Sequence, residues 1–450
     1  MSNDGKTPTS NSGKIRSLSA PPDKPRAVPV SDPDYDAATT TLELDPTTSR
    51  WHVRATSISQ CVEKLGEVWT EAADEASAKE TPAESREQAM ADPRLASRMA
   101  NDKSVRVRMR TSVLTLVVLA PRPELSERAL AAINALHQRH PSRAIVVSPG
   151  DFDGPAHMDA HIYAECKLND RAGAEMCTEQ ILIKTGGELS QHLARVVTPL
   201  LIHDLPVVLW WPDDPPFGTR QFNEVVGTAD RLLVDSGSFN EDGGKRMAGL
   251  ATVVANGVSV TDIGWLRLTL WRELLAGMFD HPLLVQELDH IKSVRIDVAR
   301  PTSTLRVSKA AFYLGWLGSR LRWEVARPLT RDGGQDDDYL HGAFRRGKRE
   351  IEVEIRPVRS TLDGAQRAAG SLVRVDIEAV RPRATVRARI TRQSDHLLAT
   401  ADWNGAQVSR RAGQLEPFDE TPFIAEALDS PGLDRIFEGA LTRAVRLVSG

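Results

Sequence analysis

The 450-residue sequence predicts an α/β fold, in which a layered mixed sheet carries helices on both faces, followed by an α+β domain with an antiparallel sheet. Between residues 105 and 290, short apolar runs typical of buried strands alternate with amphipathic helical patterns, which is the rhythm of βαβ units. From residue 350 onward, apolar residues recur with a period of two, as in antiparallel strands with one exposed face. We therefore divide the chain into a disordered tail (1–50), a helical segment (51–104), an α/β domain (105–290) and an α+β domain (291–450).

Composition and charge narrow the possible partners. The 57 basic and 61 acidic residues give a formal net charge of −4, which provides no overall field for nucleic acid. No apolar run approaches the length of a membrane span, and the amino terminus lacks the apolar core of a signal peptide. We therefore expect a cytoplasmic protein that binds neither nucleic acid nor membrane. The three cysteines are too few for a disulfide framework and lack the paired spacing of a zinc site.

The first 50 residues are rich in Ser, Thr, Pro, Asp and Lys, and their few large apolar residues cannot offset the entropy of ordering. The helical segment that follows begins with an amphipathic pattern over residues 58–76. Cys61 belongs to the apolar face of this helix, where a core thiol is expected. A second, more polar helix is expected over residues 84–91.

The α/β domain begins with an apolar run that is expected to form one strand with an exposed start and a buried end. A helix whose apolar positions share one face and a returning strand follow it, and the alternation then repeats. Such a rhythm indicates a sheet with helices on both faces. The expected strands are 105–120, 144–147, 205–211 and 231–235, and the expected helices are 123–140, 188–201 and 222–229.

The strand over residues 205–211 ends in two tryptophans and a proline-rich loop. Adjacent residues of a strand point to opposite faces, so Trp210 is expected in the core and Trp211 near the carboxyl edge, where open α/β sheets bind ligands. The competing interpretation is that both tryptophans pack internally. Asp213 and Asp214 are charged and are expected to keep the following loop exposed to solvent. We count them with Trp211 among the candidate partner-binding residues.

Residues 262–280 predict one helix, capped by Asp262, with apolar residues on two stripes. A helix this apolar must be covered on both sides, either by internal packing or by another protein. Four further candidate partner-binding residues lie on it, namely Trp265, Arg267, Trp271 and Arg272.

Catalytic and cofactor motifs are missing from the sequence. The turn after the first strand reads APRPELS, which has no glycine for close approach to a pyrophosphate, and neither GxxxxGK[ST], HExxH nor GxSxG occurs. Gly186 and Gly187 precede a helix that could bind an anion, but such a pair is more often a simple turn. We therefore predict no catalytic, cofactor-binding or metal-binding residues and expect a protein that is not an enzyme.

Two cysteines are a candidate redox pair. If residues 160–168 and 176–184 pair antiparallel around the polar loop 169–174, Cys166 lies directly opposite Cys177, within reach of a disulfide. The alternative is a pair of reduced thiols, which the cytoplasm favours.

The C-terminal region is expected to contain a helix, a four-stranded antiparallel sheet and a final helix that covers its apolar face. Arg387 and Arg389 point the same way in their strand, and this basic face is either solvated or meets an acidic surface or a sugar phosphate. The expected helices are 303–323 and 433–448, and the strands are 350–356, 372–380, 384–391 and 396–403.

Four phrases, DLPVVLWWP, CTEQILI, ADRLLVDS and GWLRLTLWRE, resemble the glucose-6-phosphate dehydrogenase assembly proteins called OpcA. The resemblance covers residues 105–280 and continues more weakly toward the carboxyl end. It implies a non-catalytic partner that binds glucose-6-phosphate dehydrogenase of the oxidative pentose phosphate pathway, promotes its active oligomer and acts as an allosteric effector.

Two other functions remain open at this stage. The main alternative is a sensor or enzyme that binds a small phosphorylated ligand at the carboxyl edge of the α/β sheet. The other is a nucleic-acid adaptor that uses the arginine-bearing strands, which the net charge of −4 disfavours.

Overall fold

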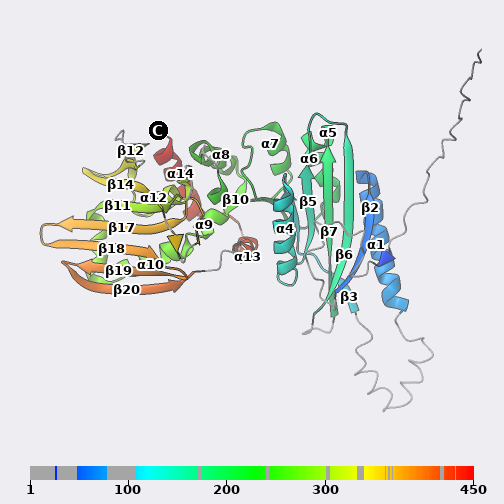
Figure 1. Ribbon diagram of the computed structural model, residues 1–450, viewed down its shortest axis with the longest axis horizontal. Coiled ribbons are helices and arrows are strands. Elements are labelled where there is room, and N and C mark those ends of the chain that lie inside the picture. The colour runs from blue at the N-terminus through cyan, green and yellow to red at the C-terminus, as the bar shows by residue number, and fades with distance from the viewer. Residues whose placement is uncertain are drawn as a thin grey trace, which may run out of the picture.

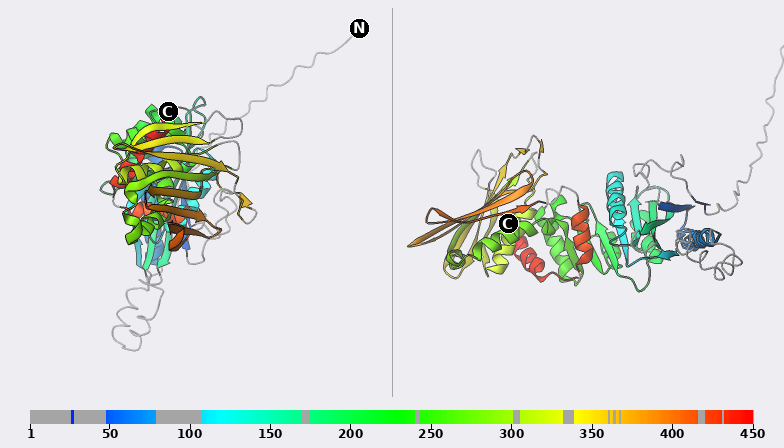
Figure 2. Two further views of the ribbon diagram at one scale, coloured as in Figure 1. Left: turned by 90° about the vertical axis from the view of Figure 1, so that its left-hand side faces the viewer. Right: turned by 90° about the horizontal axis from the view of Figure 1, so that it is seen from below.

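The structure is a computed structural model and describes residues 26–27, 48–78, 107–169, 174–239, 243–300, 305–331, 339–359, 361–362, 365–366, 368–415, 420–430 and 432–449. The expected helix over residues 84–91 and most of the expected tail lie outside these ranges. Two large sheets lie at opposite ends of an elongated molecule, and most of the helices of the second half of the chain lie between them (Figures 1 and 2).

The first sheet has ten strands in the described part of the chain. Their bounds are β1 Arg26–Ala27, β2 Thr48–Ala55, β3 Val107–Arg110, β4 Leu114–Leu119, β5 Ser142–Pro149, β6 His157–Asn169, β7 Ala174–Gly186, β8 Val207–Trp211, β9 Arg231–Val234 and β10 Ser259–Asp262. The order is β1-β2-β6-β7-β5-β4-β8-β9-β10, with β3 beside β7. The strands from β7 to β10 are parallel, whereas β6, β2 and β1 continue antiparallel from β7. This is the mixed sheet that the sequence predicts.

Helices cover both faces of the first sheet, as predicted. On one face pack α1 Ile58–Ala78, α6 Leu193–Val197, α7 Arg220–Val226 and α8 Gly243–Ala255, which share a core with Trp211. On the other face pack α4 Pro123–Leu136 and α13 Thr421–Asp429, whose core contains Trp210. Helix α13 comes from the carboxyl-terminal part of the chain, so residues more than 290 positions apart complete one core.

The first sheet differs from the prediction in three places. The single strand expected over residues 105–120 is two strands. The first, β3, pairs with β7, and just after it Thr111 N–H donates to the carbonyl oxygen of Cys177 in β7. The chain then moves away from β7 and forms β4 between β5 and β8. Residues 48–55, divided above between a tail and a helical segment, form β2, in which Trp51 and Val53 are buried at a period of two. The helix expected over residues 188–201 is broken at His192 into α5 Glu188–Gln191, α6 and the 3-10 turn η1 Thr198–Leu200.

The second sheet has eight strands in the described residues, in the order β12-β13-β14-β11-β17-β18-β19-β20. The bounds are β11 Ile291–Ala299, β12 Glu324–Arg331, β13 Leu340–Arg346, β14 Arg349–Val358, β17 Leu372–Arg381, β18 Ala384–Arg392, β19 His396–Trp403 and β20 Ala406–Gln414; β15 Thr361–Leu362 and β16 Ala365–Gln366 form a separate hairpin. Strands β11 and β14 are parallel, so the prediction of a wholly antiparallel sheet is wrong at this pair. The four strands expected from the period of two are present as β14, β17, β18 and β19.

A helical layer joins the two sheets. It contains α9 Ile263–Leu266, α10 Thr269–Phe279, α11 Pro282–Val285, α12 Ser308–Arg320 and α14 Arg435–Val448, together with the 3-10 turns η2 Ser236–Ser238 and η3 Leu288–His290. Helix α10 packs on β18, β19 and β20, and α12 packs along α14. One hydrophobic core therefore runs from the first sheet through these helices into the second sheet.

Candidate functional site

The exit from β8 does not expose Trp211. Trp211 is only 6% exposed and packs against Phe222 of α7, with ring centroids 5.4 Å apart. Phe217 closes the same region, with its ring centroid 5.1 Å from that of Phe222. The prediction that Trp211 lies at an accessible edge is therefore wrong, because the loop after β8 folds its own aromatic residues over the strand end. Trp210 is fully buried, as expected.

The two acidic residues of this loop are ion-paired. Asp213 pairs with Arg122, which lies in the turn between β4 and α4, over 3.2 Å, and Asp214 pairs with Arg246 of α8 over 3.0 Å. The loop is thereby fixed to the turn after β4 and to α8. Asp213 retains partial exposure, so it remains a candidate for contact with a partner.

The helix expected over residues 262–280 is two helices, α9 and α10, with a break at Arg267 and Leu268. Asp262 caps the first of them, as predicted, and accepts the N–H of Gly264 over 3.0 Å. Trp265 is buried, and its indole N–H donates to Asp434 over 2.9 Å. Arg272 lies 3.5 Å from the centroid of the same ring.

Trp271, the second tryptophan of this segment, is also buried. The aromatic candidates of residues 262–280 are therefore packing residues.

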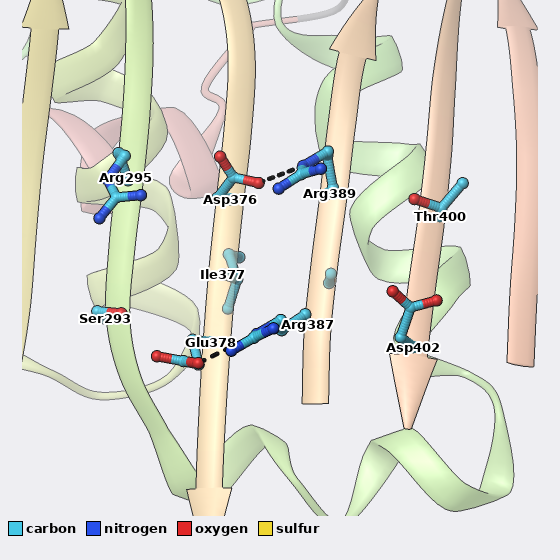
Figure 3. A pocket seen from close by; sticks show the side chains of 10 residues that line it. Ser293, Arg295, Asp376, Ile377, Glu378, Arg387, Arg389, Thr400 and Asp402 are labelled. Atoms are coloured by element: carbon cyan, nitrogen blue, oxygen red, sulfur yellow. Dashed lines mark hydrogen bonds and ion pairs between the residues drawn. The ribbon is translucent and has the colours of Figure 1, made fainter. Parts of the chain in front are cut away.

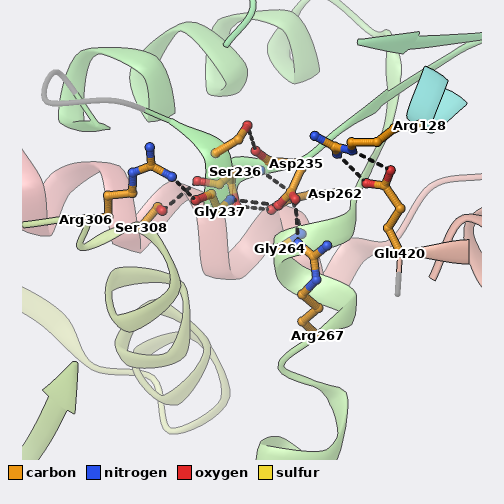
Figure 4. A network of polar contacts seen from close by, with 11 residues as sticks. Arg128, Asp235, Ser236, Gly237, Asp262, Gly264, Arg267, Arg306, Ser308 and Glu420 are labelled. Carbon is orange, nitrogen blue, oxygen red and sulfur yellow. Dashed lines mark hydrogen bonds and ion pairs between the residues drawn. The ribbon is translucent and has the colours of Figure 1, made fainter. Parts of the chain in front are cut away.

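The break between α9 and α10 directs Arg267 into a polar cluster at the carboxyl ends of β9 and β10 (Figure 4). Arg267 pairs with Asp235, the residue after β9, and together with Lys309 it lowers the pKa of that carboxyl although burial opposes the change. Asp262, the last residue of β10, accepts the backbone N–H and the hydroxyl of Ser236 over 2.8 and 2.6 Å. Burial raises the pKa of Asp262 to about 6.

A pocket of about 500 Å³ opens beside this cluster. Its walls come from the ends of β9 and α9, from the first turns of α10 and α12, from α13, and from the edge of the second sheet. The described residues that line it include five cationic and three acidic side chains: Arg128, Arg267, Arg306, Lys309 and Arg392, with Asp235, Glu273 and Glu426. Of these, only Arg267 belonged to the predicted set.

Lys309 is the most unusual of these side chains. Burial lowers the pKa of its ammonium to about 8. Within the part of the chain that the structure describes, Lys309 forms no ion pair. No sequence signal could have selected it, because, apart from Arg306, its neighbours in the pocket come from segments tens to hundreds of residues away.

The outward face of the second sheet carries charged side chains around a shallow hollow of about 470 Å³ (Figure 3). Arg387 donates to Glu378 over 3.3 Å, and Arg389 donates to Asp376 over 2.6 Å. The two arginines point the same way, as predicted, but the neighbouring strand β17 supplies an acid to each. The face is therefore mixed in charge rather than basic.

The hairpin β6–β7 has the register that the sequence predicts, with Cys166 directly opposite Cys177. The two form a disulfide, with Cα atoms 4.0 Å apart. Cys61 is free and buried in α1, and burial raises the pKa of its thiol to about 11. Its place in the core agrees with the expected core thiol.

Gly186 and Gly187 form a turn. Gly187 has a φ of +60°, and a Cβ there would overlap the backbone of residues 154–156. Helix α5, which follows, has only four residues, so it offers little of the N-terminal field that would hold an anion.

Two further kinds of site were sought by the chemistry they need and are absent from the described chain. No three His, Cys, Asp or Glu side chains in it lie close enough together to hold a metal ion. Among the same residues, no helix combines the length and apolar character needed to cross a membrane.

Known proteins match both halves of the chain. Residues 133–249 match the OpcA domain family described as glucose-6-phosphate dehydrogenase subunit N-terminal domain, and residues 258–441 match the corresponding C-terminal domain family. A protein of Nostoc punctiforme named as the OxPP cycle protein OpcA is 27% identical over 333 residues, which are 70% of this chain and 68% of that protein. Its Synechocystis namesake is 28% identical over 202 residues, 45% of this chain and 41% of that protein.

Solved structures give a weaker similarity. The apo scyllo-inositol dehydrogenase of Lactobacillus casei aligns with a TM-score of 0.40 at 9% identity, over 76% of this chain and 96% of that one. Similarity at this level establishes neither a common activity nor a common ligand.

Proposed function

Because the chain belongs to the OpcA family of glucose-6-phosphate dehydrogenase subunits, we propose that it is a non-catalytic partner that promotes the active oligomer of that dehydrogenase and acts as its allosteric effector. The observation that carries the proposal is the extent of the match. The two matched domains span residues 133–249 and 258–441, and these ranges include most strands of both sheets and the helical layer between them.

The turn between β4 and α4 supports a non-catalytic role. In dinucleotide-binding folds this turn is rich in glycine, so that backbone amides can approach a pyrophosphate. Here it contains Pro121, Arg122 and Pro123, and Arg122 is held by Asp213. The turn therefore lacks the glycines that would let backbone amides approach a pyrophosphate.

In this proposal the dehydrogenase docks on the outward face of the second sheet (Figure 3). One face of this sheet packs on α10, α12 and α14, while the other presents Arg387 and Arg389 with their acidic partners. Fixed charges of both signs favour specificity and orientation in docking more than raw affinity. Asp213, in the loop after β8, is a second candidate contact.

The direct test combines association and kinetics. The purified chain is titrated into the dehydrogenase of the same organism, and both sedimentation and NADP reduction are measured. We expect no turnover of glucose 6-phosphate by the chain alone, and a higher activity or a lower KM of the dehydrogenase in the complex, because an effector must bind one state of its partner preferentially. Unchanged kinetics at saturating complex would contradict the proposal.

The docking surface has a separate test with a matched control. Arg387→Ala and Arg220→Ala each remove one exposed arginine and one ion pair, since Arg387 pairs with Glu378 and Arg220 with Glu224. We expect Arg387→Ala to slow association and to change its salt dependence, while Arg220→Ala leaves both unchanged. Equal behaviour of the two variants would place the docking surface elsewhere without affecting the proposed partnership.

A further inference from the structure

A second hollow, which we call the α4 cleft, opens beside α4 at the carboxyl ends of β5 and β7, a position at which open α/β sheets bind ligands. Its volume of about 370 Å³ lies within the range of small-molecule sites. The start of α4 contributes Pro123, Ser126 and Leu130 to the lining, and β6 contributes His161 and Tyr163. The cleft thus lies between a helix and a strand that are far apart in the order of the sheet.

The floor of the α4 cleft is apolar. Val146 of β5 lies beside Leu182 of β7, and Leu182 lies opposite His161 of β6, so the three side chains share the face of the sheet on which α4 packs. Leu130 and Val146 are buried, and Leu182 is partly buried. Two prolines of the turn before α4, Pro121 and Pro123, complete the lining, and their fixed φ angles limit the freedom of this rim.

Three nearly parallel rings gather on β6 and on β2 beside it. His52 of β2 lies opposite Tyr163 in the register, with ring centroids 4.7 Å apart and planes 21° apart. The His52 and His161 rings are 5.2 Å apart with planes 9° apart, and a hydrogen bond of 3.0 Å joins them. A flat aromatic ligand can stack on such an array, whose members need little further ordering.

Polar groups that can orient a ligand stand on both sides of the cleft. The hydroxyls of Ser126 and Ser148 are 2.9 Å apart, and only one of the two can donate to the other, so the second hydrogen is available to a ligand. Across the cleft, Nδ1 of His157 donates to the carbonyl oxygen of Pro155 over 3.1 Å, which leaves Nε2 of the neutral ring as an acceptor. The His157 ring lies against Gly186, where a Cβ would overlap it.

Charges of both signs meet at the rim of the cleft. Lys184 lines it, and the residue opposite Lys184 in β6 is Asp159. The Asp159 carboxylate accepts two hydrogen bonds from Arg54, of 2.7 and 3.0 Å. Apolar and aromatic side chains with a few hydrogen-bonding groups favour a neutral ligand at this place over a free ion.

We propose that the α4 cleft binds a neutral heteroaromatic ring of the kind found in nucleosides. The ring lies over Val146 and Leu182 and stacks against the rings of β6, while its polar edge accepts from the serine pair and donates to Nε2 of His157. Because the turn after β4 lacks the glycines that admit a pyrophosphate, the ligand is a nucleoside or a free base rather than a dinucleotide. The proposal goes beyond the partnership with the dehydrogenase, since the chain alone binds the ligand.

Saturation-transfer NMR on the full chain tests the inference. The probes are adenosine, ribose and cyclohexanol, each added at up to about 10 mM, a range in which weak binding also raises the thermal midpoint. We expect adenosine to bind, with stronger saturation of its base protons than of its ribose protons, and ribose alone to give no signal. Cyclohexanol, which is apolar but not aromatic, is expected to bind at least about tenfold more weakly than adenosine.

Ser126→Leu is the diagnostic variant, because it puts a larger apolar side chain into the cleft at a helical position. Ser59→Leu is the matched control, since Ser59 is an exposed serine of α1 outside the cleft. We expect the first to raise the Kd for adenosine at least about tenfold and the second to leave it unchanged. Thermal unfolding without ligand verifies that both are folded.

Ser126→Ala decides the matter if Ser126→Leu does not fold, because alanine suits a helix and only a hydroxyl is lost. This variant is expected to raise the Kd about fivefold. The inference is wrong if adenosine does not bind, if cyclohexanol binds as tightly as adenosine, or if the folded Ser126 variants bind like the natural protein. Each of these results leaves the proposed partnership untouched, because that is measured with the dehydrogenase present.

Discussion

Trp210 and Trp211 are neighbours in β8, yet their indole rings lie in two different hydrophobic cores on opposite faces of the first sheet. Both are buried, so we expect Trp210→Ala and Trp211→Ala each to lower the free energy of unfolding by about 3–5 kcal/mol. Phe152→Ala is the control, since Phe152 is 47% exposed and a surface substitution typically changes stability by less than about 0.5 kcal/mol. Denaturant unfolding measures all three.

The burial of Trp211 also gives a prediction about binding. Trp211→Phe keeps an aromatic ring against Phe222, so the variant is expected to fold and to bind the dehydrogenase with unchanged affinity. A loss of affinity without a loss of stability would restore the tryptophan as a contact residue.

The disulfide between Cys166 and Cys177 closes a short loop with a sequence separation of 11. Chain entropy predicts that reduction lowers the free energy of unfolding by about 3 kcal/mol. Under denaturing conditions, thiol counting is expected to find one thiol in the oxidised protein and three after reduction. Before denaturation, Cys61 is expected to react slowly, because it is buried and its pKa is raised to about 11.

Asp262 makes stability depend on pH. Its folded pKa of about 6 lies above the usual 3.8, so the folded state binds the proton more tightly than the unfolded state. The contribution of this group to the free energy of unfolding is fully present below about pH 4. It is lost as the pH rises through about 6, and the loss amounts to at most about 3 kcal/mol.

Asp262→Asn removes this titration. The variant is therefore expected to gain stability relative to the natural protein as pH rises through this range, and unfolding of both proteins between pH 4 and 7 measures the difference. A constant difference across the range would show that Asp262 keeps an ordinary pKa next to Asp235 and Ser236.

Helix α12 meets α14 at a glycine. A Cβ on Gly315 would overlap the carbonyl oxygen of Ala440, so Gly315→Ala is expected to force the two helices apart and to cost about 1–3 kcal/mol. Gly66 in α1 is the matched control, because a Cβ there meets nothing within 4 Å. Gly66→Ala is expected to raise stability by about 0.5–1 kcal/mol, since alanine is the better helix former. Thermal unfolding distinguishes the two.

The sequence by itself determined the features that depend on near neighbours in the chain. The period of two and the loop length placed Cys166 opposite Cys177, and Asp262 before an apolar run marked a helix start. The alternation of apolar runs and helical patterns predicted a sheet covered on both faces, and the quoted phrases identified the family. These signals are local, since side-chain periodicity and capping act over a few residues.

Only the tertiary structure decided which segments meet. The burial of Trp211 depends on Phe222 in the next helix, and the parallel pairing of β11 with β14 joins strands separated by a helix and two further strands. The pocket gathers Arg128, Arg267 and Lys309 from three distant segments. Periodicity reports how polar the surroundings of a residue are but not which residues supply them, so contacts between distant segments follow only from the packing of the whole chain.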